Sequence, residues 1–373
     1  MKVSSPSAIA PRHPTLSQSV HACRERRLHE PDRVDLSDSP RLKLFGVSMP
    51  LSGAKAAEDP PPPAEPPAGT YQNPLVEEFT ADPAVLREGE VYYLYTTSGN
   101  EPAGFPIRAS RDLVHWEPHG AIFPPGGRPG WTRSDLWAPS VHRLGDRYMA
   151  YYTARDETER LCIGAAWSDR PDGHFVDLGG PLIRNPAVGM IDPQLFVDED
   201  GRSYLYWKGD HNDLRPQEPT PIYVQEVACD GITLLGEPTE VLHNDLEWEG
   251  DLVEGPWVEK HGPWYYLFYS GNSFWNERYA MGVARARSPL GPFEKKGAPV
   301  LSSNQAWMGP GHGAVVDTPG GAEYMLYHSW EAGRVGAPHP RVLLMDRVDW
   351  GCDGWPRIHD GSPSRTPRPL PAV

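Results

Sequence analysis

Apolar and polar residues alternate in short runs from residue 71 onward, and turns rich in glycine and charge separate these runs. Five stretches share one order: a proline or glycine, a short apolar strand, a turn and an aromatic strand. They read ADPAVLREGEVYYLYTTSG, WAPSVHRLGDRYMAYYTA, IDPQLFVDEDGRSYLYWKG, EGPWVEKHGPWYYLFYSG and GHGAVVDTPGGAEYMLYHSW. Their aromatic strands begin at Tyr92, Tyr148, Tyr204, Tyr265 and Tyr324. Alternation on both sides of such turns predicts β-hairpins.

A third strand and a weaker fourth follow each hairpin, as in MGVARARSPLGPFEKKG. The repeats recur every 55 to 65 residues or so, a little more than is usual for propellers of roughly 40 to 50. We therefore expect an all-β fold, a five-bladed β-propeller with four antiparallel strands per blade, because radial repetition protects the edges of many short strands. A two-sheet sandwich or jelly roll is the alternative, in which five evenly spaced copies are hard to place.

The N-terminal 68 residues differ in composition, being rich in Ser, Pro and Arg without sustained periodicity and ending in EDPPPPAEPPAGT. This pattern predicts a disordered tail with a polyproline linker over residues 1–68, followed by a propeller catalytic domain over 69–373. Within the tail, RLKLFGVSMPLSGAKAAEDP has a basic start, a short apolar stretch and an Ala-Lys-Ala ending. These features outline a secretory signal and favour an extracellular location over a cytoplasmic one.

Charge and composition narrow the range of partners. The chain carries a formal net charge of −15, whereas a nucleic acid or an anionic membrane would require a basic surface, so we expect neither as a partner. No apolar run approaches the ~18 residues of a membrane span. The four cysteines are too scattered for a zinc or redox motif. We expect a monomer that acts on a neutral substrate.

The start of the first strand in each repeat holds the candidate chemistry. In a propeller these strands line the axis, so the residues at their starts share one end of the channel. Those residues are Asp82, Ala138, Asp192, Glu254 with Gly255, and His312. An Asp-Pro pair is by itself an ordinary turn signal, but Ala138 indicates that folding needs no acid in this position. We therefore predict that three acids and a histidine converge.

Converging carboxylates are costly unless they are solvated, protonated or paired, because like charges push one pKa upward. Such an arrangement can provide a carboxylate base together with a carboxylic acid that stays protonated near neutral pH. Cleavage of a glycosidic bond requires that pair of groups.

Six motifs in order, ADPAV, WAPSV, IDPQLF, EGPWV, GPGHGAVV and DGWP, resemble glycoside hydrolase family 43. That family consists of five-bladed propellers and includes β-xylosidases, α-L-arabinofuranosidases and arabinanases. The resemblance covers most of the chain after residue 70. It implies an inverting glycoside hydrolase of pentose-containing plant polysaccharides or oligosaccharides, exo-acting, of the α-L-arabinofuranosidase or β-xylosidase type.

The resemblance also implies roles for the three acids. Asp82 would be the general base that activates water, and Glu254 the general acid that protonates the leaving oxygen. Asp192 would modulate the pKa of the acid and orient the sugar. Inversion would place base and acid about 6.5 to 9.5 Å apart, leaving room for a water molecule.

Four further residues are candidates for substrate binding. His312 matches a fifth-blade histidine that in several family members lies beside a cation or water on the axis. A Ca2+ ion there is an expectation only, because hard cations prefer several oxygen ligands, and no cofactor is expected to be required. Arg341 matches an arginine that reaches the sugar. Trp137 and Phe105 are candidate aromatic walls, with core packing as the alternative for both.

Two other functions stay open at this point. One is a non-catalytic carbohydrate-binding propeller. The other is a related five-bladed enzyme that acts on fructosides with retention, which would carry Asn-Asp-Pro-Asn-like and Glu-Cys-Pro-like motifs where this chain has TADPAV and VEGPWV.

Overall fold

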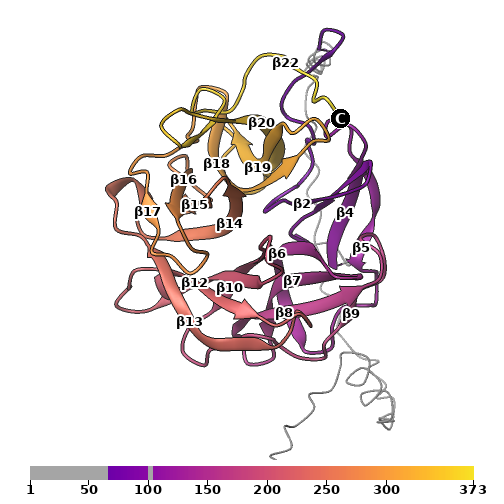
Figure 1. The fold of residues 1–373 in the computed structure, drawn as a ribbon, viewed down its shortest axis with the longest axis vertical. Coiled ribbons are helices and arrows are strands. Elements are labelled where there is room, and N and C mark those ends of the chain that lie inside the picture. Colours follow the sequence, from indigo (N-terminus) through magenta and orange to yellow (C-terminus); the bar gives the residue numbers. More distant parts are fainter. Residues whose placement is uncertain (1–65, 100–103) are drawn as a thin grey trace, which may run out of the picture. The chain divides into compact units, whose positions relative to one another are not determined.

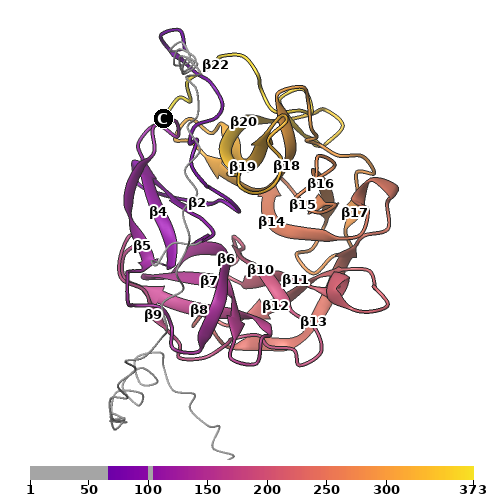
Figure 2. The same ribbon diagram turned by 180° about the vertical axis from the view of Figure 1, so that it is seen from behind.

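The computed structural model describes residues 66–99 and 104–373, which form the predicted five-bladed β-propeller. The expected tail and secretory signal lie outside the described residues, apart from the last positions of the linker. Figure 1 shows the five sheets arranged around a common centre, and Figure 2 shows the same ring from behind. Within the described ranges, the helical segments are the short turns η2 (His211–Asp213) and η3 (Glu247–Glu249), and no helix is long and apolar enough to cross a membrane.

Each blade is a four-stranded antiparallel sheet whose strands follow one another in sequence from the axis outward. Blade 1 consists of β2 (Ala84–Glu88), β3 (Val91–Tyr95), β4 (Gly104–Ser110) and β5 (Glu117–Phe123). Blade 2 consists of β6 (Thr132–Leu144), β7 (Arg147–Asp156), β8 (Leu161–Ser168) and β9 (Val176–Asp177). Blade 3 consists of β10 (Met190–Val197), β11 (Ser203–Gly209), β12 (Pro221–Val227) and β13 (Leu234–His243). Blade 4 consists of β14 (Val253–His261), β15 (Trp264–Gly271), β16 (Ala280–Ala286) and β17 (Glu294–Lys295). Blade 5 consists of β18 (Trp307–Asp317), β19 (Glu323–Glu331), β20 (Val342–Trp350) and β21 (Pro356–Ile358).

The innermost strands β2, β6, β10, β14 and β18 contact one another in succession, and β18 contacts β2 to complete the ring. Hydrophobic clusters fill the space between neighbouring blades rather than a single central core. Buried tyrosines of the aromatic strands dominate these clusters, as the repeat predicts. Two of them also tie blades together by hydrogen bonds, because Tyr95 donates to the Pro171 carbonyl at 2.8 Å and Tyr206 to the Pro289 carbonyl at 2.6 Å.

The ring is closed by the segment that precedes blade 1. Strand β1 (Thr70–Tyr71) pairs with β22 (Arg368–Pro369), and the segment continues along β20 of blade 5. Asn73 is the main polar contact there: its side chain accepts the Met345 amide at 3.0 Å and donates to the Met345 carbonyl at 3.1 Å and to Ser364 Oγ at 3.0 Å. Since Asn73 is buried, these hydrogen bonds join the two ends of the propeller where no water can replace them.

We expect Asn73→Ala to lower the free energy of unfolding by about 2 to 4 kcal/mol, because it leaves the Met345 amide without a partner and opens a small void. Urea unfolding monitored by tryptophan fluorescence measures this change. Gln305→Ala, at an exposed surface position, is the control and should change stability by less than about 0.5 kcal/mol. Equal stabilities of the two variants would contradict the role given to Asn73.

Candidate active site

One residue near the start of each inner strand has a left-handed backbone conformation. The φ angles are 51° at Asp82, 42° at Ala138, 57° at Asp192, 60° at Gly255 and 46° at His312. In β6, β10, β14 and β18 the pairing with the second strand shifts register at this point. A bulge of this kind bends the strand and redirects a side chain. Gly255, rather than Glu254, therefore occupies the equivalent position in blade 4, and Glu254 projects from the residue before it.

Side chains of the neighbouring blade accept hydrogen bonds from all five of these backbone amides. The amide of Ala138 donates to Thr97 Oγ1 at 2.9 Å, that of Asp192 to Thr153 Oγ1 at 3.0 Å, that of His312 to Ser270 Oγ at 2.8 Å, and that of Asp82 to His328 Nδ1 at 3.1 Å. In blade 4 the amide of Gly255 donates to the Asp192 carboxylate at 3.0 Å. Each blade thus fixes the strand start of the next one.

The Asp82 carboxylate lies among hydrogen-bond donors. Its Oδ1 accepts from Arg341 Nη1 at 2.8 Å, and its Oδ2 accepts from Thr97 Oγ1 at 2.6 Å. The Nδ1 atom of His312 lies 3.4 Å from Oδ1. Burial alone would raise the pKa of Asp82, but Arg341, followed by the two histidines His312 and His328 and by Thr97, holds that pKa well below its usual range. Asp82 is therefore ionised at neutral pH and free to accept a proton.

Both oxygens of Glu254 have partners. Tyr279 donates its hydroxyl to Oε1 at 2.8 Å, and Lys208 Nζ lies 3.2 Å from Oε2. The Lys208 ammonium also pairs with Asp210 at 3.0 Å and is 1% exposed. Burial would lower the pKa of Lys208, but Glu254, Asp210 and Asp192 raise it above its usual value, so Lys208 is a cation. Glu254 is thereby held between a neutral donor and a buried positive charge.

Asp192 is the third acid, and its pKa is shifted in the opposite direction to that of Asp82. Burial raises the pKa of Asp192 to about 6; His312 opposes this shift and Glu254 reinforces it. Asp192 therefore titrates close to neutral pH.

The ring of His312 lies beside Asp82 and above Gly255, where an added Cβ atom would come within 3.0 Å of the imidazole. A small cavity of about 10 Å³ lies next to it on the axis and has room for about one water molecule. In the part of the chain that the structure describes, no group of three or more His, Cys, Asp or Glu side chains is arranged to hold a metal ion. The described side chains around His312 therefore do not form a ligand set for Ca2+, which prefers several oxygen ligands.

The predicted Arg341 lies on Asp82 rather than on Glu254, and its guanidinium packs over aromatic rings. The guanidinium carbon is 4.4 Å from the ring centroid of Phe274 and 5.7 Å from that of Phe79. Phe79 is 40% exposed, and Trp275, which packs against Phe274, is 60% exposed. These exposed aromatic rings beside the Asp82–Arg341 pair are candidate contacts for a sugar, and the sequence analysis did not single them out.

Trp137 and Phe105 differ in their surroundings. Trp137 is partly buried and directly precedes Ala138 in β6, so it stays a candidate wall. Phe105 is fully buried in a hydrophobic cluster, with its ring centroid 6.0 Å from that of Phe123 and 5.2 Å from that of Tyr152. This position corrects the expectation that Phe105 lines the site, because the ring has no surface left for a substrate.

Sequence reasoning also missed Lys208, Tyr279 and the residues that fix the strand starts. A signal for some of them exists in the repeat. Four or five residues after the tyrosine that begins each aromatic strand, the chain carries Thr97, Thr153, Lys208, Ser270 and His328. All five have polar side chains that point to the same end of the propeller as the acids. Tyr279 lies in a loop outside the repeated pattern, so no periodicity could identify it.

The arrangement supplies one carboxylate held ionised by an arginine, a second carboxyl group between a tyrosine and a lysine, and a third that can carry a proton near pH 6. Two carboxyl groups in such different environments can serve as base and acid.

Three comparisons place these features among known proteins. Residues 71–356 match the family model of glycosyl hydrolases family 43. The Beta-D-galactofuranosidase xynD of Aspergillus niger is 30% identical over 74% of this chain and 81% of its own length. The Xylosidase/arabinosidase 43B of Humicola insolens is 30% identical over 78% of this chain, but the chain spans only 55% of that relative. A solved thermostable family-43 glycoside hydrolase is 32% identical, with a TM-score of 0.74 over 82% of this chain and 100% of the other.

The two Asp-Pro acids should affect stability in opposite directions. The raised pKa of Asp192 penalises the folded state above pH 6, so Asp192→Asn should stabilise the protein at pH 8 by at most about 3 kcal/mol, and the gain should vanish near pH 4. The lowered pKa of Asp82 stabilises the folded state above the unfolded value, so Asp82→Asn should destabilise it at pH 8 by about 3 to 5 kcal/mol, because Arg341 stays buried without its partner.

Urea unfolding of both variants and the wild type at pH 4 and pH 8 measures these differences. Changes of the same sign at pH 8 would show that the pKa values of the two carboxyl groups are not shifted in opposite directions.

Proposed function

The chain belongs to glycosyl hydrolases family 43 and is a glycosidase, and on that premise we propose that it is an inverting, exo-acting enzyme that removes terminal pentosyl units. The proposed substrates are α-L-arabinofuranosyl or β-D-xylosyl units at the ends of plant oligosaccharides and polysaccharides. The activities by which relatives are named, such as that of the Xylosidase/arabinosidase 43B, support this substrate class. The observation that carries the proposal is the difference in environment between Asp82 and Glu254.

In the proposed reaction Asp82 takes a proton from a water molecule, whose oxygen forms a bond to the anomeric carbon. The glycosidic C–O bond breaks at the same time, and Glu254 gives its proton to the leaving oxygen. The Arg341 and Thr97 contacts support Asp82 as the base, since they keep it ionised before the reaction. Attack and departure on opposite faces of the sugar invert the anomeric configuration.

We propose that Lys208 and Asp192 control how easily Glu254 gives its proton to the leaving oxygen. The Lys208 ammonium stabilises the carboxylate that Glu254 becomes after protonating the leaving group. Asp192 acts in the other direction when ionised, because its negative charge favours the protonated form of Glu254. Tyr279 orients the carboxyl group through Oε1. We therefore treat Lys208, Asp192 and Tyr279 as positioning residues around the acid.

A second furanoside deserves testing beside the pentosides. The Beta-D-galactofuranosidase xynD of Aspergillus niger shares 30% identity with this chain over 81% of its own length. Galactofuranose and arabinofuranose both present a five-membered ring to the site. A panel of nitrophenyl α-L-arabinofuranoside, β-D-xyloside and β-D-galactofuranoside identifies the preferred sugar.

Asp82→Ala should reduce kcat about 10²- to 10⁴-fold on every active glycoside, because no other group takes the proton of water. Glu254→Ala should reduce kcat much less on a nitrophenyl glycoside than on an unactivated disaccharide such as xylobiose, because nitrophenolate leaves without an acid. Asp200→Asn, in the exposed β10–β11 turn, is the control. Full activity of Asp82→Ala on any glycoside, or of Glu254→Ala on xylobiose, would refute the assignment.

The identity of the first-formed anomer, read by proton NMR, tests inversion directly, and a retained configuration would favour the fructoside-type mechanism. Binding of glycosides without any hydrolysis by the wild type would instead favour a carbohydrate-binding propeller.

Removing the buried cation should slow the reaction most where the leaving group needs a proton. In Lys208→Met/Asp210→Asn, whose second change removes the carboxylate that Lys208 neutralises, the negative charge left on Glu254 after proton transfer has lost its partner. We expect kcat on xylobiose to fall about tenfold and kcat on a nitrophenyl glycoside to fall less. Lys260→Met, which removes a lysine paired with Asp198 and Glu199 in blades 3 and 4, is the control. An unchanged kcat on xylobiose in the folded double variant would show that Lys208 does not act on the acid.

A further inference from the structure

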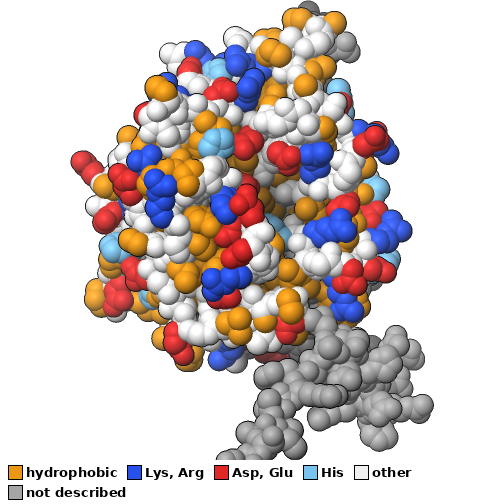
Figure 3. Space-filling view, in the orientation of Figure 1, with side chains coloured by type: hydrophobic (Ala, Val, Ile, Leu, Met, Phe, Trp, Pro, Cys, Tyr) orange, Lys and Arg blue, Asp and Glu red, His pale blue; other side chains and the backbone are white. Residues whose placement is uncertain are grey.

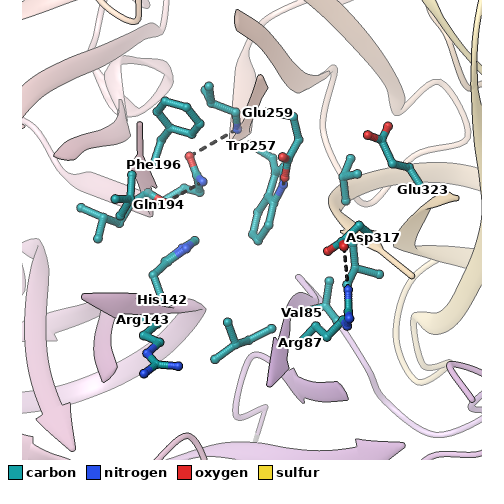
Figure 4. A pocket seen from close by; sticks show the side chains of 16 residues that line it. Val85, Arg87, His142, Arg143, Gln194, Phe196, Trp257, Glu259, Asp317 and Glu323 are labelled. Carbon is teal, nitrogen blue, oxygen red and sulfur yellow. Dashed lines mark hydrogen bonds and ion pairs between the residues drawn. The ribbon is translucent and has the colours of Figure 1, made fainter. Parts of the chain in front are cut away.

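A second hollow lies on the propeller axis at the other end of the inner strands (Figure 4). Each inner strand contributes a lining residue that comes three to five positions after the residue at its active-site end. These pairs are Asp82 and Val85, Ala138 and His142, Asp192 and Phe196, Glu254 and Glu259, and His312 and Val315. At a rise of about 3.3 Å per residue, three to five residues correspond to roughly 10 to 17 Å along the axis. The hollow has a volume of about 380 Å³, which is in the size range of small-ligand sites.

The two ends of the axis are separated from each other. Gln194 and Trp257 line both the second hollow and the one-water cavity beside the acids. The side chain of Gln194 is fixed, because it donates to the Leu195 carbonyl at 2.8 Å and accepts the Val258 amide at 3.3 Å. A sugar cannot pass a cavity of about 10 Å³, so the second hollow has no passage to the acids and is not part of the active site.

The two arginines around this pocket are already paired with carboxylates. Arg87 contacts Asp317 at 2.7 Å, which joins blades 1 and 5, and Arg143 contacts Glu88 at 3.0 Å, which joins blades 2 and 1. Figure 3, which shows one face of the molecule, has acidic and basic side chains interspersed among apolar ones. Since both arginines of the pocket have carboxylate partners, an anion would gain little there, and the pocket suits an uncharged ligand.

Three side chains offer what an uncharged ligand needs. Trp257 presents its indole ring and donates Nε1–H to Glu259 Oε1 at 2.7 Å, whereas Oε2 of Glu259 has no hydrogen bond to a side chain of residues 66–99 and 104–373. Burial raises the pKa of Glu259 to about 8, against the opposing effect of Trp257, so at pH 7 the carboxyl group is mostly protonated and can donate. The ring of His142 packs against Trp257 with centroids 5.7 Å apart.

His142 is the group that lacks a partner. Its buried Nε2 has no hydrogen bond to any residue that the structure describes. Burial lowers the pKa of His142 to about 3, so the ring is a neutral imidazole at pH 7. Figure 4 shows His142 and Trp257 approaching the pocket from different inner strands. A buried imidazole nitrogen without a hydrogen-bond partner lowers the stability of the protein while the pocket is empty. A ligand hydroxyl group that hydrogen-bonds this nitrogen removes that cost.

We propose that this pocket is a second, non-catalytic sugar-binding site that holds one or two uncharged sugar units. The indole of Trp257 packs against a C–H face of the sugar, while Glu259 and His142 hydrogen-bond its hydroxyl groups. Because the pocket opens at the opposite end of the axis from the acids, it can hold an end of a glycan while the active site acts on another. The site goes beyond the proposed catalytic function and depends on neither Asp82 nor Glu254.

The test follows the indole N–H resonance of Trp257 in protein labelled with 15N-tryptophan, assigned by its loss in Trp257→Phe. D-xylose and L-arabinose are titrated into the wild type, and xylotriose into Asp82→Ala, which prevents hydrolysis. We expect at least one of the sugars to move this resonance saturably, with a Kd in the millimolar range. Saturation by the monosaccharides identifies the ligand as free sugar, and saturation by xylotriose alone identifies it as a glycan chain.

Variants of the two polar groups separate binding from a general perturbation. His142→Ala and Glu259→Ala should each weaken binding about tenfold, the worth of one hydrogen bond, while Glu259→Gln keeps a donor and should bind like the wild type. Glu117→Gln, on the exposed edge strand β5, is the matched control. A Trp257 resonance that no sugar moves, or unchanged affinity in both alanine variants, would overturn the proposal. If the wild type binds sugar at Trp257 but hydrolyses no glycoside, that result would count only against the catalytic assignment.

Discussion

The left-handed backbone near the start of the inner strands is the constraint on which the rest of the site depends. Four of the five residues in this conformation are not glycine, and for an L-residue it costs roughly 1 to 2 kcal/mol. The neighbouring blade offsets that cost, because Thr97, Thr153, Ser270 and His328 each accept a hydrogen bond from the amide concerned. These hydrogen bonds therefore stabilise the strained backbone and also fix the position of each blade relative to the next one. Ala138 shows that this geometry exists independently of the chemistry, since it adopts the conformation and offers no functional group.

Once the backbone has brought the acids together, distant partners decide their charge states. Asp82 and Asp192 stand in nearly identical local sequences, each before a proline at the start of an inner strand. Asp82 meets the Arg341 guanidinium, which comes from the other end of the chain, and stays ionised. Asp192 meets the Gly255 amide and lies near Glu254, and its pKa rises to about 6. The difference between the two acids thus comes from tertiary contacts and not from their motifs.

The fold and the convergence of the three acids could be predicted from the sequence because both follow from the repeat. The tyrosine strands recur with regular spacing, Asp82 and Asp192 occupy equivalent positions at the start of their inner strands, and Glu254 lies one residue before that position. Tyr279 could not be predicted, because it reaches Glu254 from a loop outside the repeat. Phe105 was assigned to the site incorrectly, because a phenylalanine that packs between blades and one that faces a sugar look alike in sequence. The position of Glu254 was uncertain by one residue, since only the backbone angles reveal that Gly255 is the equivalent of Asp82.

The inner strands also explain why one short segment can serve two kinds of site. An inner strand that passes the active site reaches the second pocket, at the other end of the axis, three to five residues later. In β14 this means that Glu254 contacts Lys208 at one end while Glu259, five residues on, accepts from Trp257 at the other. Glu254 has the buried cation Lys208 beside it, whereas the hydrogen bond that Glu259 accepts comes from the neutral indole of Trp257. The first end is therefore suited to proton transfer and the second to neutral hydrogen bonding, and Gln194 between them keeps the two environments separate.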